Sequence, residues 1–248
     1  MKRDLDMVVI SDVHIGSFGC HAEELNIYLK SINPKKIILL GDIIDGYVFD
    51  KKNFNKHQVQ FFRIILDFIK KNVEVYYLTG NHDDFLRQFD DFEIMNFKKV
   101  DKLVLEINDK KYWFFHGDVF DISMKGTFGK LATSFGGKAY DLIIIFNRWL
   151  NVILKKMGKS PFSLSKKIKD NVKKAVKFVS DFEKISCEHA INQKYDFVIN
   201  GHIHQPQIKE FKNEKGSVVY MNSGDWIENL SSLEFDGVDW KIHYFNEQ

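Results

Sequence analysis

The sequence predicts an α/β protein with a parallel sheet in its first half, and with further strands and a helical insertion in its second half. Over residues 6–78, short apolar runs alternate with stretches of helical periodicity, an order that implies right-handed crossovers between parallel strands. Residues 103–115 and 197–244 hold further apolar runs that indicate strands. A lysine-rich segment at residues 126–191 separates these two sets, and we expect it to be mostly helical.

The first half alternates strands and helices without a long linker. Leu25, Tyr28 and Leu29 stand three or four positions apart, which is the spacing of one helix face, and Pro34 is expected to end this helix. The strands are short apolar runs that end in polar residues. The predicted elements are strands at 6–11, 36–40 and 73–78 and helices at 22–32 and 54–70.

The second half predicts a hairpin and a further set of strands. Asn108-Asp109 is a typical hairpin turn between two apolar runs. Ser160-Pro161 is expected to mark a turn between two long helices. We expect residues 1–248 to form a single domain, with residues 122–192 as a helical insert or lid within it. The predicted strands are 103–107, 111–115, 197–200, 208–211, 218–221, 232–235 and 240–244.

Composition excludes several classes of protein. The chain has 248 residues, 44% hydrophobic and 28% charged, which excludes a disordered chain and allows a core of ordinary size. Its two cysteines, Cys20 and Cys187, exclude a disulfide framework and favour a reducing compartment. The first residues lack the apolar run of a secretion signal, and no apolar stretch has the length of a membrane-spanning helix. We therefore expect a cytoplasmic protein.

Charge is distributed unevenly along the chain. The formal net charge is +2, but residues 122–180 carry a net +11, which leaves −9 on the remainder. A block this basic beside an acidic remainder indicates an anionic partner for the block and cation binding elsewhere. The alternative is a helical hairpin packed on the sheets, with its lysines forming a solvated face.

Asp, Asn and His residues with a neighbouring glycine follow five of the predicted strands. In open α/β sheets, ligands bind beyond the carboxyl ends of the strands, where such loops meet. Alternation places both side chains of Asp12-x-His14, and both of His202-x-His204, on one side of an extended segment. The motifs are Asp12-Val13-His14, Gly41-Asp42, Gly80-Asn81-His82-Asp83, His116-Gly117-Asp118 and Gly201-His202-Ile203-His204.

These residue types predict a site for two metal ions. Carboxylate oxygen, amide oxygen and imidazole nitrogen suit Mn²⁺, Fe or Zn²⁺. Two metals ~3.5–4 Å apart need a bridging ligand, for which Asp42 is the natural candidate. His57, His189 and His243 lie outside the motifs and are expected to be ordinary structural residues, whereas His21 stays open. Cys20 is expected to be a free buried thiol.

The five motifs, in this order, resemble the calcineurin-like metallophosphoesterase family, whose pattern is D-x-H, G-D-x-x-D, G-N-H-D/E, H and G-H-x-H. The second motif reads Gly41-Asp42-Ile43-Ile44-Asp45 here. The resemblance implies a four-layer fold of two packed mixed β-sheets flanked by helices. It implies that His82 is the catalytic histidine and that Asp83 orients it. It also implies one metal held by Asp12, His14, Asp42 and His204, and a second held by Asp42, Asn81, His116 and His202.

Further segments resemble the UDP-2,3-diacylglucosamine diphosphatase branch of this family. That branch implies hydrolysis at the α-phosphate to lipid X and UMP, a step of lipid A biosynthesis. It also implies dependence on Mn²⁺, with Fe or Zn²⁺ left open by the donor types, and a peripheral position on the cytoplasmic face of the inner membrane. The segments are Ser11–His21, Gly41–Gly46, His116–Asp121, Ala139–Leu142, Asn171–Glu183 and Asn222–Trp226.

The same resemblance implies how the substrate is held. In this branch the helical insert is a lid over the acyl chains, and the best-known members carry arginine where this chain has His82. The implied substrate-binding residues are Asn81, His82, Asp121, Asn171 and Lys174.

Other functions fit the same sequence. A soluble nucleotide or protein phosphoesterase would use the same two metals, and a nuclease would use the lysines to contact phosphates. The non-enzymatic hypothesis is a binding or scaffold protein with a degenerate phosphoesterase fold. We expect the partner to be an anionic glycolipid or a nucleotide-type phosphoester rather than nucleic acid.

Overall fold

The computed structural model describes residues 2–47, 54–120 and 165–245, and for residues 165–176 it describes the backbone alone. The chain divides into two compact units, Met1–Val119 with Ser186–Gln248, and Phe120–Ile185.

A seven-stranded sheet forms the first layer of β structure in the larger unit. Its order is β12-β11-β1-β2-β3-β5-β4, and the four strands from β1 to β5 in this order are parallel. The strands β4, β11 and β12 run antiparallel to their neighbours, so the sheet is mixed. The bounds are β1 Arg3–Ile10, β2 Ile32–Leu40, β3 Glu74–Leu78, β4 Phe92–Ile94, β5 Phe97–Val100, β11 Ser231–Phe235 and β12 Trp240–Tyr244.

A five-stranded sheet, in the order β6-β7-β8-β10-β9, forms the second β layer. Its three central strands, β7, β8 and β10, are parallel, and an antiparallel strand closes each edge. The bounds are β6 Leu103–Ile107, β7 Lys110–Phe114, β8 Phe197–Asn200, β9 Gln207–Asn213 and β10 Gly216–Asn222.

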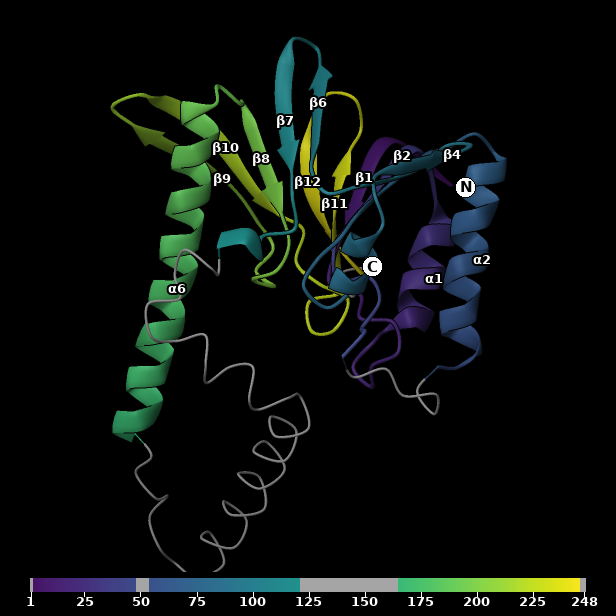
Figure 1. The fold of residues 1–248 in the computed structure, drawn as a ribbon, viewed down its shortest axis with the longest axis horizontal. Coiled ribbons are helices and arrows are strands. Elements are labelled where there is room, and N and C mark those ends of the chain that lie inside the picture. Colours follow the sequence, from purple (N-terminus) through teal and green to yellow (C-terminus); the bar gives the residue numbers. More distant parts are fainter. Residues whose placement is uncertain (1, 48–53, 121–164, 246–248) are drawn as a thin grey trace, which may run out of the picture. The chain divides into compact units, whose positions relative to one another are not determined.

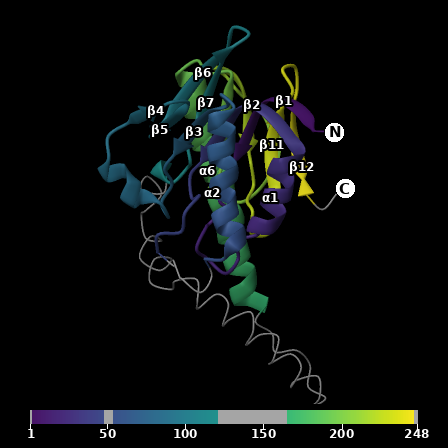
Figure 2. The same ribbon diagram turned by 90° about the vertical axis from the view of Figure 1, so that its right-hand side faces the viewer.

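Helices α1 (Ala22–Ser31) and α2 (Lys56–Lys70) lie side by side next to the seven-stranded sheet (Figures 1 and 2). Asn55 caps α2, because its side chain accepts hydrogen bonds from the amides of His57 and Gln58. A short 3₁₀ helix, η1 (Asp84–Gln88), follows β3.

Two hydrophobic cores hold these layers together. One core lies under the helices and includes Leu25 and Tyr28 of α1, Phe61 of α2 and Val8 of β1. The other contains side chains from both sheets, so the sheets pack face to face. Its members are Met7, Val9, Ile38, Leu40, Tyr76, Leu78, Leu103, Tyr112, Phe114, Ile199, Met221, Leu233 and Phe235.

The last turns of α6 (Ser165–Asn192) belong to the larger unit. There, the rings of His189 and Trp113 on β7 are 5.0 Å apart, which places helix against the second sheet. Helix, sheet, sheet and helix therefore form the four layers expected from the family resemblance.

The smaller unit contains the remainder of α6 and Phe120, whose ring lies 6.1 Å from that of the buried Phe182. The predicted turn at Ser160-Pro161 and the predicted substrate residue Asp121 lie outside the described residues. Asn171 and Lys174 belong to α6, but their side chains lie outside the described residues.

The predicted mixed α/β architecture with two packed sheets is confirmed, with two local differences. Strand β2 begins at Ile32 and includes Pro34, which pairs with Leu5 of β1, while pairing with β3 begins at Lys36. Pro34 lies outside the part of β2 that pairs with β3. The amide hydrogen that proline lacks is therefore not needed for a hydrogen bond to β3. The sequence reading also missed strands β4 and β5, which are only three and four residues long.

Among the described residues, no helix combines the length and the apolar character needed to cross a bilayer.

Phe114 tests the core between the sheets. Its side chain is fully buried there, so we expect Phe114→Ala to lower the free energy of unfolding by about 3–5 kcal/mol. Denaturant unfolding measures this change, and Phe18→Ala, at a side chain that is 88% exposed, is the matched control. Equal losses in the two variants would contradict the packing described above.

Candidate metal and active site

The residues predicted for the site stand where parallel strands end. Asp12 follows β1, Asp42 follows β2 and Asn81 follows β3, all in the seven-stranded sheet. His116 and His202 follow β7 and β8 in the five-stranded sheet. Both packed sheets therefore contribute to one site at the carboxyl ends of their strands.

Five residues of the site have a left-handed backbone, which residues other than glycine rarely adopt; the prediction of extended segments at Asp12-x-His14 and His202-x-His204 is therefore wrong. Hydrogen bonds across the loops hold this geometry: the amides of Val13 and His14 both donate to the carbonyl of Asp42, at 3.0 and 2.9 Å. Such strain persists only where the surroundings impose it, and it clusters at functional sites. The residues, with φ from 52° to 65°, are Asp12, His14, Asp42, His202 and His204.

Gly41 lets the end of β2 approach His116. Its φ is +80°, and a Cβ atom at this position would overlap the imidazole of His116. Only glycine satisfies both conditions without a shift of the loop or the ring.

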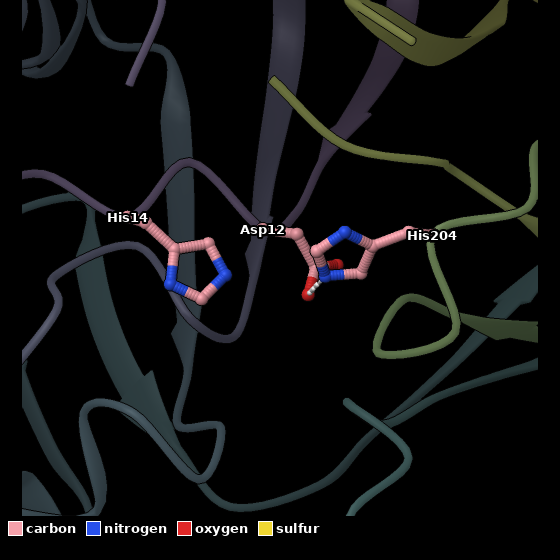
Figure 3. A group of neighbouring side chains, drawn as sticks. All are labelled: Asp12, His14 and His204. Carbon is pink, nitrogen blue, oxygen red and sulfur yellow. Dashed lines mark ion pairs between the residues drawn. The ribbon is translucent and has the colours of Figure 1, made fainter. Parts of the chain in front are cut away.

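The first group of possible metal ligands contains Asp12, His14 and His204, which each offer one donor atom within 4.8 Å of the others (Figure 3). His204 Nε2 lies 3.1 Å from Asp12 Oδ1. Both Asp12 and His14 are buried, whereas a third of the His204 side chain is exposed.

The second group contains Asp42, His116 and His202, whose donor atoms meet the same limit of 4.8 Å. His116 Nε2 lies 3.2 Å from Asp42 Oδ2, and His14 Nε2 of the first group lies 3.9 Å from the same oxygen. Asp42 thus lies between the two groups, as a bridging ligand must.

Several buried atoms of the site have no hydrogen-bond partner. Four of them are Asp12 Oδ1, His14 Nε2, Asn81 Oδ1 and His116 Nε2, of which Asp12 Oδ1 and His116 Nε2 have the ion-pair contacts given above but no hydrogen bond. A buried polar atom without a partner is costly, and here all four atoms are good metal donors. The residues therefore fit a pair of divalent cations, whose coordination would satisfy these atoms.

The other nitrogen of two histidines faces a fixed acceptor. His14 Nδ1 lies 3.3 Å from Asp45 Oδ2, and His116 Nδ1 lies 2.9 Å from the carbonyl oxygen of Leu40. An acceptor at Nδ1 holds the proton there and leaves Nε2 free to bind a metal.

Asp45, rather than Asp83, faces the ring of His82. Asp45 Oδ1 lies 3.1 Å from His82 Nδ1. The sequence interpretation gave this orienting role to Asp83. That carboxylate instead accepts hydrogen bonds from the amides of Ile43 and Gly80 and, at 2.6 Å, from the hydroxyl of Tyr77. Asp83 therefore fixes the loop that carries His82, and not its ring.

Sequence reasoning assigned no role to Asp45, although it is the second aspartate of G-D-x-x-D.

The sequence analysis also missed a set of contacts that joins the loops after β3 and β7. There, Arg87 forms two contacts with Asp118, of 2.8 and 3.0 Å, and donates to the carbonyl of Thr79 at 3.0 Å. Two parallel contacts of this kind fix orientation as well as distance.

The carboxylates hold protons on the histidines. Burial disfavours a charged imidazole, yet Asp42 raises the pKa of His116 to about 10. Burial likewise opposes charge on His204, and Asp12 raises its pKa to about 9. Burial is also overcome at His82, where Asp45 raises the pKa. The same negative field would attract a divalent cation.

The histidines outside the motifs lie apart from these groups. His21 forms an ion pair with Glu24 at 3.3 Å, and with Cys20 and His57 it lines a pocket of about 240 Å³. Burial raises the pKa of the Cys20 thiol to about 12, which fits an unreactive thiol.

A model of the calcineurin-like phosphoesterase family matches residues 5–206, and the chain belongs to this family. It is a metal-dependent phosphoesterase, and members of the family use two metal ions.

Two curated relatives, both named UDP-2,3-diacylglucosamine hydrolase, align over nearly the whole chain. The protein of Aliivibrio fischeri (strain MJ11) is 23% identical over 248 residues, which cover 96% of this chain and 98% of the relative. The protein of Blochmanniella pennsylvanica (strain BPEN) is 22% identical over 249 residues, which cover 93% and 92%. The solved structure of an archaeal phosphodiesterase is 15% identical and covers 96% of this chain and 98% of its own, with a TM-score of 0.46.

Metal uptake should release protons at neutral pH. With pKa values of about 10 and 9, His116 and His204 are protonated at pH 7, and a metal bound through Nε2 of each ring would displace that proton. We expect roughly two protons per chain, measured by calorimetric titration of metal into buffers of different ionisation enthalpy. The release should shrink and the apparent affinity should rise as the pH approaches 10, and a proton-neutral uptake at pH 7 would contradict this arrangement.

Proposed function

We propose that this phosphoesterase hydrolyses the pyrophosphate bond of UDP-2,3-diacylglucosamine and releases lipid X and UMP, a step of lipid A biosynthesis. The reaction class rests on the groups Asp12–His14–His204 and Asp42–His116–His202, which together with Asn81 contain four buried donor atoms without a hydrogen bond. The substrate rests on the names of two relatives that align with nearly the full chain.

We assign the metal ligands from the two groups and from the unpartnered atom of Asn81. Mn²⁺ is our preferred metal, and Fe and Zn²⁺ are alternatives that the same donor types accept. The first cation would bind Asp12, His14, Asp42 and His204, and the second would bind Asp42, Asn81, His116 and His202.

The residues around the metals divide the chemistry. Two divalent cations in such a site polarise phosphoryl oxygens and lower the pKa of water. His82, whose pKa is raised by the Asp45 carboxylate at its Nδ1, donates a hydrogen bond to a phosphoryl or leaving-group oxygen. Asp83 keeps the backbone of this loop in place. The site thus provides a positioned acid beside a centre that stabilises negative charge.

The basic block supports an anionic amphiphile as substrate. Residues 122–180 carry a net +11, and residues 141–156 within them are densely apolar, which suits acyl chains joined to a phosphate. We propose Asp121, Asn171 and Lys174 as substrate contacts, together with Asn81 and His82. A peripheral contact with the inner membrane belongs to the same proposal.

The histidine at position 82 supports a second candidate function, that of a soluble phosphoesterase acting on nucleotides or proteins. This chain has the general family histidine where the best-known diphosphatases of the branch carry arginine. Because the two candidates share one metal site, acyl-chain dependence separates them.

An assay with added Mn²⁺ against UDP-2,3-diacylglucosamine tests the substrate. We expect UMP to form, and we expect UDP-N-acetylglucosamine to react far more slowly because it lacks the acyl chains. Equal turnover of the two compounds would overturn the lipid proposal and favour the second candidate. Hydrolysis that persists after chelation of all metal would overturn the reaction class.

The variants Asp42→Ala and His82→Ala separate metal binding from proton donation. Asp42 lies between the two ligand groups, so its loss should abolish turnover and lower the bound metal measured by elemental analysis. His82→Ala should lower turnover by about 10²–10⁴-fold, the usual contribution of a positioned acid, with the metal content unchanged. Loss of metal from His82→Ala, or full metal content in Asp42→Ala, would contradict these assignments.

A further inference from the structure

His204 has a carboxylate behind it, as His14 does. Asp225 Oδ2 lies 3.7 Å from His204 Nδ1, on the side of the ring away from Asp12. This distance is longer than a hydrogen bond, so the contact acts through the charge of Asp225. Asp225 lies outside the five metal motifs, within the segment Asn222–Trp226 of the branch resemblance, and it directly follows the glycine after β10.

The carboxylate of Asp225 is fixed in place. The residue is fully buried, and its Oδ1 accepts hydrogen bonds from the amides of Ile227, Glu228 and Asn229, the first at 2.8 Å. Oδ1 thus accepts the hydrogen bonds of this turn, and Oδ2 faces His204. A carboxylate held in this way directs its charge without a further loss of side-chain entropy.

Asn229 links Asp225 to the backbone of His204. Its side-chain amide donates to Asp225 Oδ2 and, at 2.9 Å, to the carbonyl of His204. His204 has a φ of 52°, so this hydrogen bond supports a backbone conformation that is unfavourable by itself.

The same short turn also holds Asp12. The amide of Trp226 donates to the carbonyl of Asp12 at 3.1 Å, and Ser223 shares a hydroxyl contact of 2.7 Å with Ser11. One segment, residues 223–229, therefore contacts both Asp12 and His204.

We infer that Asp225 and Asn229 are positioning residues for one metal of the pair, because they aim His204 Nε2 at Asp12 from behind the ring. This inference rests on the proposed metal site. A carboxylate behind a metal-bound imidazole strengthens the ligand, and its loss typically costs 10–100-fold in metal affinity. The effect is selective, since the second group has its own acceptor in the carbonyl of Leu40.

The variant Asp225→Asn tests this selectivity. It removes the charge but keeps an oxygen for the amides of the turn. We expect one class of Mn²⁺ sites to weaken about 10–100-fold in equilibrium titrations, with the second class unchanged. Electron paramagnetic resonance at two equivalents of Mn²⁺ should then show isolated ions in place of the coupled pair of the unaltered chain.

The matched control is Asp236→Asn. Asp236 accepts hydrogen bonds from the amides of Val238 and Asp239 at 3.0 and 2.9 Å, which is the same local turn chemistry away from the site. We expect it to keep both classes of sites. Asn229→Ala, which removes the hold on the His204 backbone, should weaken the same class as Asp225→Asn, and it decides the question should Asp225→Asn fail to fold.

The outcomes separate this inference from the proposed function. Two unchanged classes of sites in Asp225→Asn would overturn the inference and leave the proposed function standing. Equal weakening of both classes, together with a lower melting temperature, would also overturn it, since the role would then be structural. An unaltered chain that binds no metal would overturn the proposed function itself.

Discussion

Two buried carboxylates, Asp12 and Asp42, set the condition that the rest of the site satisfies. Burying like charges in one centre is costly unless positive charge accompanies them. Although burial opposes ionisation, the imidazoles around each carboxylate hold its pKa below the ordinary value, with His204 foremost at Asp12 and His116 at Asp42. A pair of divalent cations would take over this compensation, so the site favours cations by its electrostatics as well as by its donor types.

The fold meets this condition with both of its sheets. Parallel strands in each sheet end at the same edge, and the shared hydrophobic core between the sheets keeps the two edges together. The five left-handed residues store local strain at this edge. The extensive core elsewhere stabilises the fold enough to tolerate it.

Most of this arrangement could be predicted from the sequence, because the motif residues stand at the ends of the apolar runs that predict the strands. Asp12, Asp42 and His116 were identified because each follows an apolar run at the end of a strand. Asp45 and Asp225 received no role, since their function depends on a ring nitrogen that only the folded chain brings near. Strands β4 and β5 were missed for a different reason: three or four residues are too few for periodicity to register.

The residues proposed as metal ligands come from both sheets, so metal binding would depend on the folded state of the chain. The unfolded chain has no such site, so free metal stabilises the native state by mass action. Above the dissociation constant, each tenfold rise in free cation adds about 1.4 kcal/mol per site. Loss of the cation would therefore lower the free energy of unfolding of the native chain.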